Sequence, residues 1–261
     1  MKVIVAIKQV YDPKTVRVSR SRGMLDTRSA EFMMNPGDRY ALEEALRLKE
    51  ERGAQVVAIT MGPPGAEDIL REALAMDVDE AILLSDEAFS EVDVFGAVMI
   101  VGKAIEKIGD CDLILTGYKA SGDGAGQFGP QLAEYLDLPQ ITRASRLLVE
   151  GGKVRATHHV SDGHVLMEAS LPVVLCIEEG ANEPRYPSLP GSIAAYDERM
   201  VTIWGAEDIG LTAEEIAEGC VTEVRDTFAG PERVMGRVIT GEPDEVAREL
   251  LAELKGKGFV S

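Results

Sequence analysis

A glycine-rich segment between Leu113 and Leu136 is the part of the sequence best suited to bind a charged ligand. It reads LILTGYKASGDGAGQFGPQLAEYL, with an apolar run before five glycines and a helical pattern after them. Backbone N–H groups at the start of a helix point towards an anion, and glycine lets that anion approach the backbone closely. We therefore predict a turn that binds a phosphate; the alternative is a glycine-rich turn without a ligand.

The same segment contains a literal G-x-G-x-x-G at Gly124, Gly126 and Gly129. In a dinucleotide-binding fold this motif follows the first strand, and an acidic residue follows about 20 positions later. Here the motif follows the fourth expected strand, and a hairpin pattern comes after it. We interpret the match as coincidental, and we place the phosphate outside the carboxyl ends of the strands for a different reason, the glycine-rich start of a helix.

The elements around this turn alternate between strand and helix. Apolar β-branched runs predict buried strands at 2–8, 55–62, 80–86 and 112–117, and periodic apolar residues predict helices at 35–53, 65–76, 93–108 and 126–136. Such alternation indicates right-handed crossovers and a mostly parallel sheet covered on both faces. A small hairpin around Gly23 would lie outside this sheet.

The pattern changes after Pro139. Turn residues at Gly151-Gly152 and Asp162-Gly163 predict an antiparallel hairpin, and one more buried strand is expected at Val173–Glu179. From Asn182 onward apolar residues become sparse, with a loop at 183–192 followed by short helices and extended chain. The fold class is therefore α/β: a doubly wound, mostly parallel, Rossmann-like sheet with an added hairpin. We expect a nucleotide-binding domain at 1–190 and an extended arm at 191–261 that needs a partner surface.

Composition limits the partners and the compartment. The net charge of -18 argues against nucleic acid or an anionic membrane surface as a partner. The sequence contains no apolar run of membrane-spanning length, and its three cysteines form no C-x-x-C motif, so a reducing cytoplasm is expected. Adjacent histidines at 158 and 159 would point to opposite faces of a strand, so we predict no metal site. We also predict no catalytic residue of the chain's own.

Four segments, in order, carry a resemblance to a known family. They are VIVAIKQVYDPK, MNPGDRYALEEALRLKE, GYKASGDGAGQFGPQLAEYLDLPQITRAS and NEPRYPSLPGSIAA, which together span roughly Lys2 to Ala195. The last of them is the most specific. The chain thereby resembles the beta, or small, subunit of electron-transfer flavoproteins, and its tail is similar to that of the longer members.

The resemblance implies a Rossmann-like subunit that pairs with a larger alpha subunit carrying FAD, and that holds a second nucleotide itself. By position, the residues implied to line this nucleotide site are Ala6, Asn35, Met61, Asp123, Gly126, Gln127 and Phe128. The strand ends and the glycine-rich turn add Gly62, Gly117, Gly122, Gly124, Ala125 and Gly129. The loop with Arg185, Tyr186, Leu189 and Pro190 is implied to recognise a dehydrogenase, with Leu189 as its projecting apolar residue.

The second nucleotide is AMP in simple carriers and FAD in members that bifurcate electrons from NADH. Members with AMP typically carry three aspartates and then N-Q-T-G in this segment, whereas bifurcating members resemble D-G-D-T-A-Q-V-G-P. The sequence SGDGAGQFGPQ is closer to the second pattern. Fewer acidic side chains beside the phosphates reduce the repulsion of an added phosphate. We expect FAD in this subunit, with AMP as the alternative.

The expected function is electron transfer from NADH or a flavin dehydrogenase, such as an acyl-CoA dehydrogenase, to an acceptor. Flavin-based bifurcation would add NADH oxidation in the complex with the partner. An alternative from another class is an ATP-binding stress or signalling module, which would be a homodimer with no use for the long tail. An ATP-pyrophosphatase-like enzyme would need an S-G-G-x-D loop after the first strand, and AIKQVYDP has none.

Overall fold

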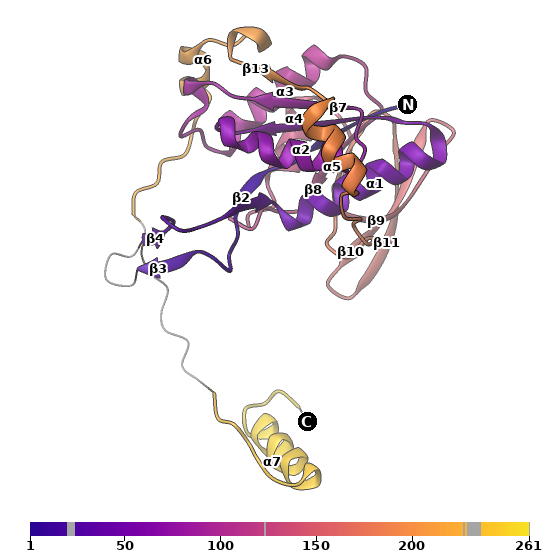
Figure 1. Cartoon of the computed structure of the whole chain (residues 1–261). Coiled ribbons are helices and arrows are strands. Elements are labelled where there is room, and N and C mark those ends of the chain that lie inside the picture. The colour runs from indigo at the N-terminus through magenta and orange to yellow at the C-terminus, as the bar shows by residue number, and fades with distance from the viewer. Residues whose placement is uncertain (20–23, 123, 227, 229–235, 261) are drawn as a thin grey trace. The chain divides into compact units, whose positions relative to one another are not determined.

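The computed structural model describes residues 1–19, 24–122, 124–226, 228 and 236–260. The chain forms two compact units: the first comprises Met1–Val18 and Leu25–Asp226, and the second comprises Ser19–Met24 and Thr227–Ser261. The first unit contains the central sheet and its helices (Figure 1). The predicted site residue Asp123 lies outside the described residues.

A nine-stranded sheet forms the middle of the first unit. In spatial order its strands are β11 (Gly163–Ser170), β10 (Lys153–Val160), β9 (Gln140–Glu150), β12 (Val173–Ile177), β8 (Leu113–Gly117), β1 (Lys2–Ala6), β6 (Gln55–Met61), β7 (Glu80–Leu84) and β13 (Val201–Trp204). The neighbouring pairs from β9 to β13 are parallel, and β10 is antiparallel to both β9 and β11. The mostly parallel α/β sheet and the added antiparallel strands confirm the predicted fold class.

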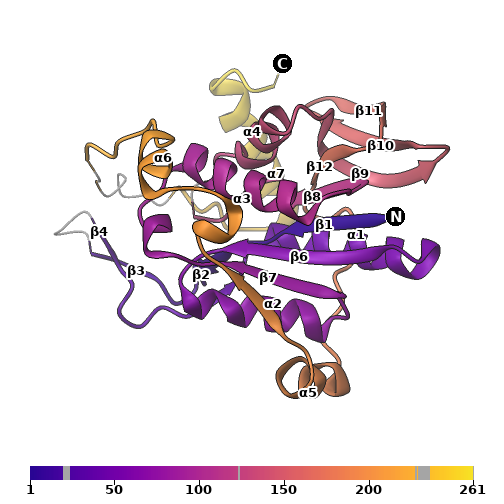
Figure 2. The same ribbon diagram turned by 90° about the horizontal axis from the view of Figure 1, so that it is seen from above.

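Helices cover both faces of this sheet, as Figure 2 shows. One face carries α1 (Pro36–Arg52) and α2 (Glu67–Ala75), and the other carries α3 (Val94–Ile108) and α4 (Phe128–Tyr135). The apolar strand KVIVA is buried between the two layers, as expected of a strand with helices on both sides. Helix α1 starts with Pro36 and ends at Gly53, whose φ of 66° and N–H bond to the Lys49 carbonyl stop the helix.

The direction of winding reverses between β1 and β8. From β1 the chain adds β6 and then β7 on one side, and it then returns to place β8 on the other side of β1. The helices between β1, β6 and β7 lie on one face, and those around β8 lie on the other. The chain therefore reverses direction at the carboxyl ends of β1 and β8, the position at which ligands generally bind in open α/β sheets.

Residues beyond 188 contribute more to the first unit than the sequence indicated. Where we expected a loop, the helix α5 (Leu189–Asp197) begins after Ser188, whose side chain accepts a hydrogen bond from the Gly191 amide. Helix α5 packs against α2, and β13 pairs in parallel with β7 as the edge strand. The loop prediction was therefore wrong from Leu189 onward. Helix α6 (Ala213–Glu218) follows and starts with a capping box at Thr212 and Glu215.

Smaller elements lie outside the main sheet. Strands β2 (Gln9–Tyr11) and β5 (Phe32–Met34) form an antiparallel pair, and β3 (Arg17–Ser19) pairs with β4 (Met24–Asp26). The second pair agrees with the predicted hairpin around Gly23, a residue outside the described part of the chain. Three short 3₁₀ helices complete the first unit at Pro64–Ala66, Glu87–Phe89 and Glu207–Ile209.

The second unit contains α7 (Pro243–Gly256), which buries none of its residues. Its side chains Leu250 and Leu251 are about half exposed, and Arg237 forms ion pairs with Glu249 and Glu253. Within the described part of the chain, no helix is long and apolar enough to cross a bilayer.

Candidate functional site

The carboxyl group of Asp38 lies buried where the sheet reverses direction. Asp38 lies in the first turn of α1 and is 6% exposed. Its Oδ2 accepts a hydrogen bond from the Lys8 amide at 2.7 Å, just beyond β1, and its Oδ1 accepts one from the Gly117 amide at 3.2 Å, at the end of β8. One side chain therefore connects the start of α1 to the carboxyl ends of the two strands.

Asn35 extends this connection to the glycine-rich turn. Its Nδ2 donates to Asp38 Oδ1 at 2.9 Å and to the Lys119 carbonyl at 3.0 Å, and its Oδ1 accepts from the Ser121 amide at 3.1 Å. Asn35 precedes α1 as expected, but its side chain makes no capping bond to that helix. The buried amide instead holds the first residues of the turn. Asn35 therefore lies beside the turn and contacts protein atoms there, and its contact with a nucleotide stays a prediction.

Burial raises the pKa of Asp38 from its ordinary value of 3.8 to about 7. Hydrogen bonds from Asn35, Lys8 and Gly117 favour the ionised form and so oppose the rise. Carboxyl groups with a strongly shifted pKa are concentrated at functional sites, which adds weight to this location.

Glycine is required at these positions of the turn for two different structural reasons. Gly124 and Gly126 adopt φ of 65°, a left-handed conformation that other residues rarely take. Gly117 and Gly129 instead allow close packing: a Cβ on Gly117 would lie 2.3 Å from Asp38 Oδ1, and one on Gly129 would lie 2.2 Å from Cys176 Sγ. Close approach of α4 to β8 and β12 therefore requires glycine at 129, the third position of the motif that we interpreted as coincidental.

The turn leads into α4 and leaves its backbone accessible. Gly122, Gly124 and Gln127 are exposed, and a Cβ at Gly122 or Gly124 would meet no atom within 4 Å. The first amides of a helix have no partner within that helix, so those at the start of α4 can donate to an anion. The geometry is suited to a phosphate, which glycines allow to approach the chain.

Apolar residues at the carboxyl end of the sheet belong to one buried layer. Ala6 at the end of β1 belongs to the hydrophobic cluster on the α3–α4 face of the sheet, and Met61 and Phe128 pack partly buried against it. Gly62 follows β6, and its amide donates to the Leu84 carbonyl at 3.0 Å. Ala6, Met61 and Phe128 thus contribute to the same apolar layer, although they come from distant segments.

Tyr118 and Arg143 support the turn from the side of β9. The Arg143 guanidinium lies 5.5 Å from the centre of the Tyr118 ring, and Arg143 Nε is 2.6 Å from Glu178 Oε2. A Cβ on Gly126 would lie 3.4 Å from Cε2 of the same ring. The ring is therefore close to both Gly126 and Arg143. Sequence reasoning missed these residues, although the Tyr118 position directly after the fourth strand was a usable signal.

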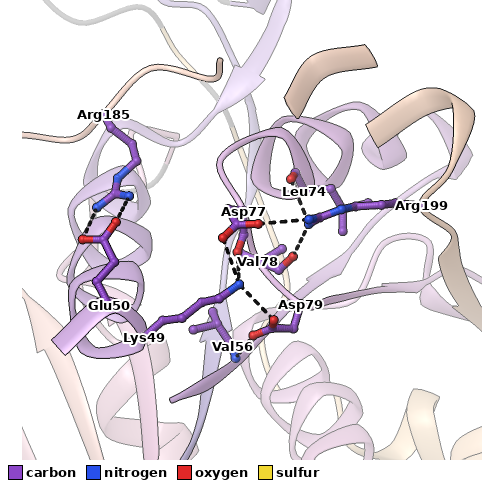
Figure 3. A network of polar contacts seen from close by, with 9 residues as sticks. All are labelled: Lys49, Glu50, Val56, Leu74, Asp77, Val78, Asp79, Arg185 and Arg199. Atoms are coloured by element: carbon purple, nitrogen blue, oxygen red, sulfur yellow. Dashed lines mark hydrogen bonds and ion pairs between the residues drawn. The ribbon is translucent and has the colours of Figure 1, made fainter. Parts of the chain in front are cut away.

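The predicted docking loop is attached to α1. The Arg185 side chain donates to Glu43 through Nε and Nη2, both at 2.9 Å, and to Glu50 through Nη1 at 2.5 Å. Figure 3 shows Arg185 next to Glu50. Asn182 reaches the neighbouring Glu44 at 3.1 Å. Arg185 is thus occupied by contacts within the chain, and its carboxylate partners raise its pKa.

The tip of this loop is open to solvent. Tyr186 is 87% exposed and Leu189 is 76% exposed, and Pro190 is also exposed. The helix that starts at Leu189 is held in turn by Arg71, which donates to the Ala195 carbonyl, and by Arg199, which contacts Asp77 (Figure 3). An exposed leucine and tyrosine on a fixed support lose little freedom when a partner binds them.

Among the described residues, no group of three or more His, Cys, Asp or Glu side chains could hold a metal ion. His159 Nε2 instead contacts Ser145 Oγ at 3.0 Å, and His158 Nδ1 contacts the Thr142 carbonyl.

Comparison with known proteins gives consistent matches. Residues 23–204 match the family model described as the electron transfer flavoprotein domain. The chain is 37% identical over 261 residues, covering all of both chains, to an electron transfer flavoprotein subunit beta of Thermoanaerobacterium thermosaccharolyticum. It is 37% identical over 263 residues to the caffeyl-CoA reductase-Etf complex subunit CarD of Acetobacterium woodii, again with full coverage of both. It is 33% identical over 270 residues, with full coverage, to the acryloyl-CoA reductase electron transfer subunit gamma of Anaerotignum propionicum.

Proposed function

Because the chain belongs to the electron transfer flavoprotein family and matches its beta subunits over their full length, we propose that it is the nucleotide-holding subunit of a heterodimeric electron carrier. The carrier takes electrons from NADH or a flavin dehydrogenase, such as an acyl-CoA dehydrogenase, and passes them to an acceptor. Membership of this family separates the chain from the ATP-binding stress and signalling modules that share an α/β architecture. We place the carrier in the cytoplasm.

The observation that supports the site best is the glycine-rich turn at the reversal point of the sheet. Its exposed backbone leads directly into Phe128, which packs against the same apolar layer as Ala6 and Met61. The turn suits the phosphates of an adenine nucleotide, and its base would lie over the ends of β1 and β6. The first amides of α4 add positive potential at the turn, which favours an anionic ligand.

We favour FAD over AMP in this subunit. Between Gly117 and Gly129 the sequence has only one acidic residue, Asp123, so little negative charge opposes a second phosphate. The names of two relatives place them in complexes with caffeyl-CoA reductase and acryloyl-CoA reductase, which fits a role beyond simple transfer. When FAD is bound, the flavin supplies the redox chemistry, and the chain supplies its position and surroundings. Such a subunit would support electron bifurcation with NADH as the donor; the alternative is a simple carrier with structural AMP.

Two surfaces would meet partners. The loop tip with Tyr186, Leu189 and Pro190 would contact the dehydrogenase, while Arg185 holds that loop on α1. Residues 191–261 would wrap the alpha subunit, which carries its own FAD. The many exposed apolar side chains beyond Asp197, among them Val224, Phe228 and Phe259, are consistent with an arm that is covered in the complex.

Nucleotide content tests the proposal. The chain is purified together with its alpha subunit, the ligands are released by heat, and FAD and AMP are counted per heterodimer. Two FAD and no AMP are expected for the bifurcating carrier, and one of each would support the simple carrier. A heterodimer with FAD in the alpha subunit alone and no nucleotide in this chain would overturn the site.

A further inference from the structure

Two aspartates connect β1 to β8, one at the amino ends of these strands (the amino edge) and one at their carboxyl ends (the carboxyl edge). At the amino edge, Asp112 Oδ2 accepts a hydrogen bond from the Lys2 amide at 2.8 Å. At the carboxyl edge, Asp38 accepts one from Lys8 and one from Gly117. Between these edges the strands are already paired in register from Val3 with Leu113 to Ala6 with Thr116. Holding the two strands together therefore does not by itself require Asp38.

Burying the carboxyl group of Asp38 costs free energy, so a buried aspartate at this position needs a functional reason. A carboxyl group removed from water loses its hydration, and hydrogen bonds restore only part of that free energy. The donors here are two strand-end amides and the side chain of Asn35, which is 1% exposed. Asn35 in turn bonds to Lys119 and Ser121, directly before the glycines. The contacts form a continuous path from the buried carboxyl group to the turn.

We propose that Asp38 is a positioning residue that fixes the phosphate-binding turn through Asn35 before the nucleotide arrives. This inference rests on the proposed function, because it presumes that the turn binds phosphate. Asp38 acts on the ligand without touching it. It orients the Asn35 amide, and that amide sets where the chain at Lys119 and Ser121 begins the turn. A turn fixed in advance does not have to be ordered when the phosphate binds.

Asparagine cannot replace aspartate in this arrangement. Oδ1 accepts from Asn35 and Gly117, and Oδ2 accepts from Lys8. An amide has one acceptor oxygen and one NH₂ group, so in either orientation the NH₂ group would face at least one N–H donor. The side chain would have to turn away or leave buried donors without partners, and Asn35 would lose its orientation.

The test compares Asp38→Asn with the matched control Asp112→Asn. Each variant is purified as the heterodimer with its alpha subunit, the bound nucleotides are removed, and the affinities for FAD, AMP and adenosine are measured at pH 8. In Asp38→Asn the affinity for AMP should fall about tenfold or more, while the affinity for adenosine changes far less. Asp112→Asn should leave the ratio of the two affinities unchanged, even if it lowers the midpoint of unfolding.

Amide hydrogen exchange in the nucleotide-free heterodimer gives a second measurement. Asp38→Asn should raise exchange at Gly117 and Ser121, and Asp112→Asn should not. If Asp38→Asn fails to fold, Asn35→Ala takes its place, because it removes the path to the turn while leaving the Lys8 and Gly117 bonds of Asp38. Equal loss of AMP and adenosine binding, or unchanged exchange at Ser121, would overturn the inference and assign Asp38 a merely structural role.

The outcomes separate this inference from the proposed function. If the wild-type heterodimer retains no nucleotide in this chain and binds neither AMP nor FAD there, the proposed function fails. If the wild type binds and Asp38→Asn binds equally well, the positioning role fails and the proposed function stands.

Discussion

The Arg185 side chain holds Glu43 of α1 with two hydrogen bonds of 2.9 Å, and the Arg185 amide donates to the same carboxylate at 3.0 Å. The Glu43 side chain is only 7% exposed, so the carboxylate in this contact is shielded from solvent. The residue before the exposed Tyr186 is thus fixed to a helix of the central domain. The loop tip takes its direction from that helix.

Glu43→Gln should loosen this attachment. Hydrogen bonds to charged groups contribute about 1.5–3 kcal/mol each, and the amide keeps only part of them, so the free energy of unfolding should fall by about 1–3 kcal/mol. Urea denaturation measures the loss, and amide exchange at Arg185 should rise. The control is Glu50→Gln on the same helix: Glu50 is largely exposed, so its ion pair with Arg185 is screened by water. Equal losses in the two variants would contradict the dominant role of Glu43.

Gly129→Ala should strain the packing of α4 on the sheet. The new Cβ would lie 2.2 Å from Cys176 Sγ and 3.0 Å from Thr116 Oγ1, so the helix must shift. Overpacking of this kind costs about 1–3 kcal/mol of unfolding free energy, measurable by thermal or urea denaturation.

Two further variants identify the cause of that strain. Gly129→Ala combined with Cys176→Ala removes the sulfur and should recover part of the loss, as a double-mutant cycle would show. Gly122→Ala, where a Cβ meets no atom within 4 Å, should be close to neutral for stability. A loss at Gly122 as large as that at Gly129 would mean that packing is not the reason.

The sequence predicted the parallel core well because each of its strands is a short apolar run between turn residues. It missed β13 because this strand is short: Val201–Trp204 has only four residues, lies partly exposed at the sheet edge and pairs with β7 alone. It also placed α5 in a loop, because the prolines around Leu189 suggested irregular chain. Proline in the first turn of a helix was the signal that could have corrected this.

At the site, local patterns identified the glycines but not the group that connects them to α1. Asp38 was one of many charges on a helix in the sequence. Its partners at Lys8 and Gly117 lie 30 and 79 positions away in the chain, so only the fold brings them together. Arg143 was missed in the same way, because it lies in β9 whereas the Tyr118 ring that it contacts follows β8.

Asp93 should hold the segment at 221–222 in place, shortly before the first unit ends at Asp226. Its carboxylate accepts hydrogen bonds from the amides of Gly96, Val221 and Thr222, at 2.9, 2.9 and 2.8 Å. Burial alone would raise the pKa of Asp93, but these donors lower it to about 2. Asp93→Ala should therefore remove the cap of α3, at about 1 kcal/mol, and release Val221 and Thr222.

Limited proteolysis and amide exchange at 221–222 check this expectation. Thr222→Val is the matched control, since it removes one side-chain donor and keeps the backbone contacts, so it should have a much smaller effect. The depressed pKa also predicts that the stability from Asp93 is present above pH 4 and is lost as the pH falls towards 2. Unchanged protease sensitivity in Asp93→Ala would show that other contacts hold this segment.

Asp38 should make the stability of the domain depend on pH in the opposite sense. An unfolded chain releases this proton near pH 3.8, whereas burial raises the pKa of the folded group to about 7. Between these values the folded state binds more protons, so the contribution of Asp38 is fully present below about pH 3.8 and is lost as the pH rises towards 7. Asp38→Asn lacks this titration, while the other carboxylates of the chain and the charge of Lys8 are common to both proteins. The free energy of unfolding of the wild type minus that of Asp38→Asn should therefore decrease from pH 5 to pH 7, by at most about 1.4 kcal/mol per pH unit, and level off by pH 8. Urea denaturation of both proteins at each pH measures the difference. A difference that stays constant from pH 5 to pH 8 would show that the three N–H donors outweigh burial and keep the carboxyl group ionised throughout.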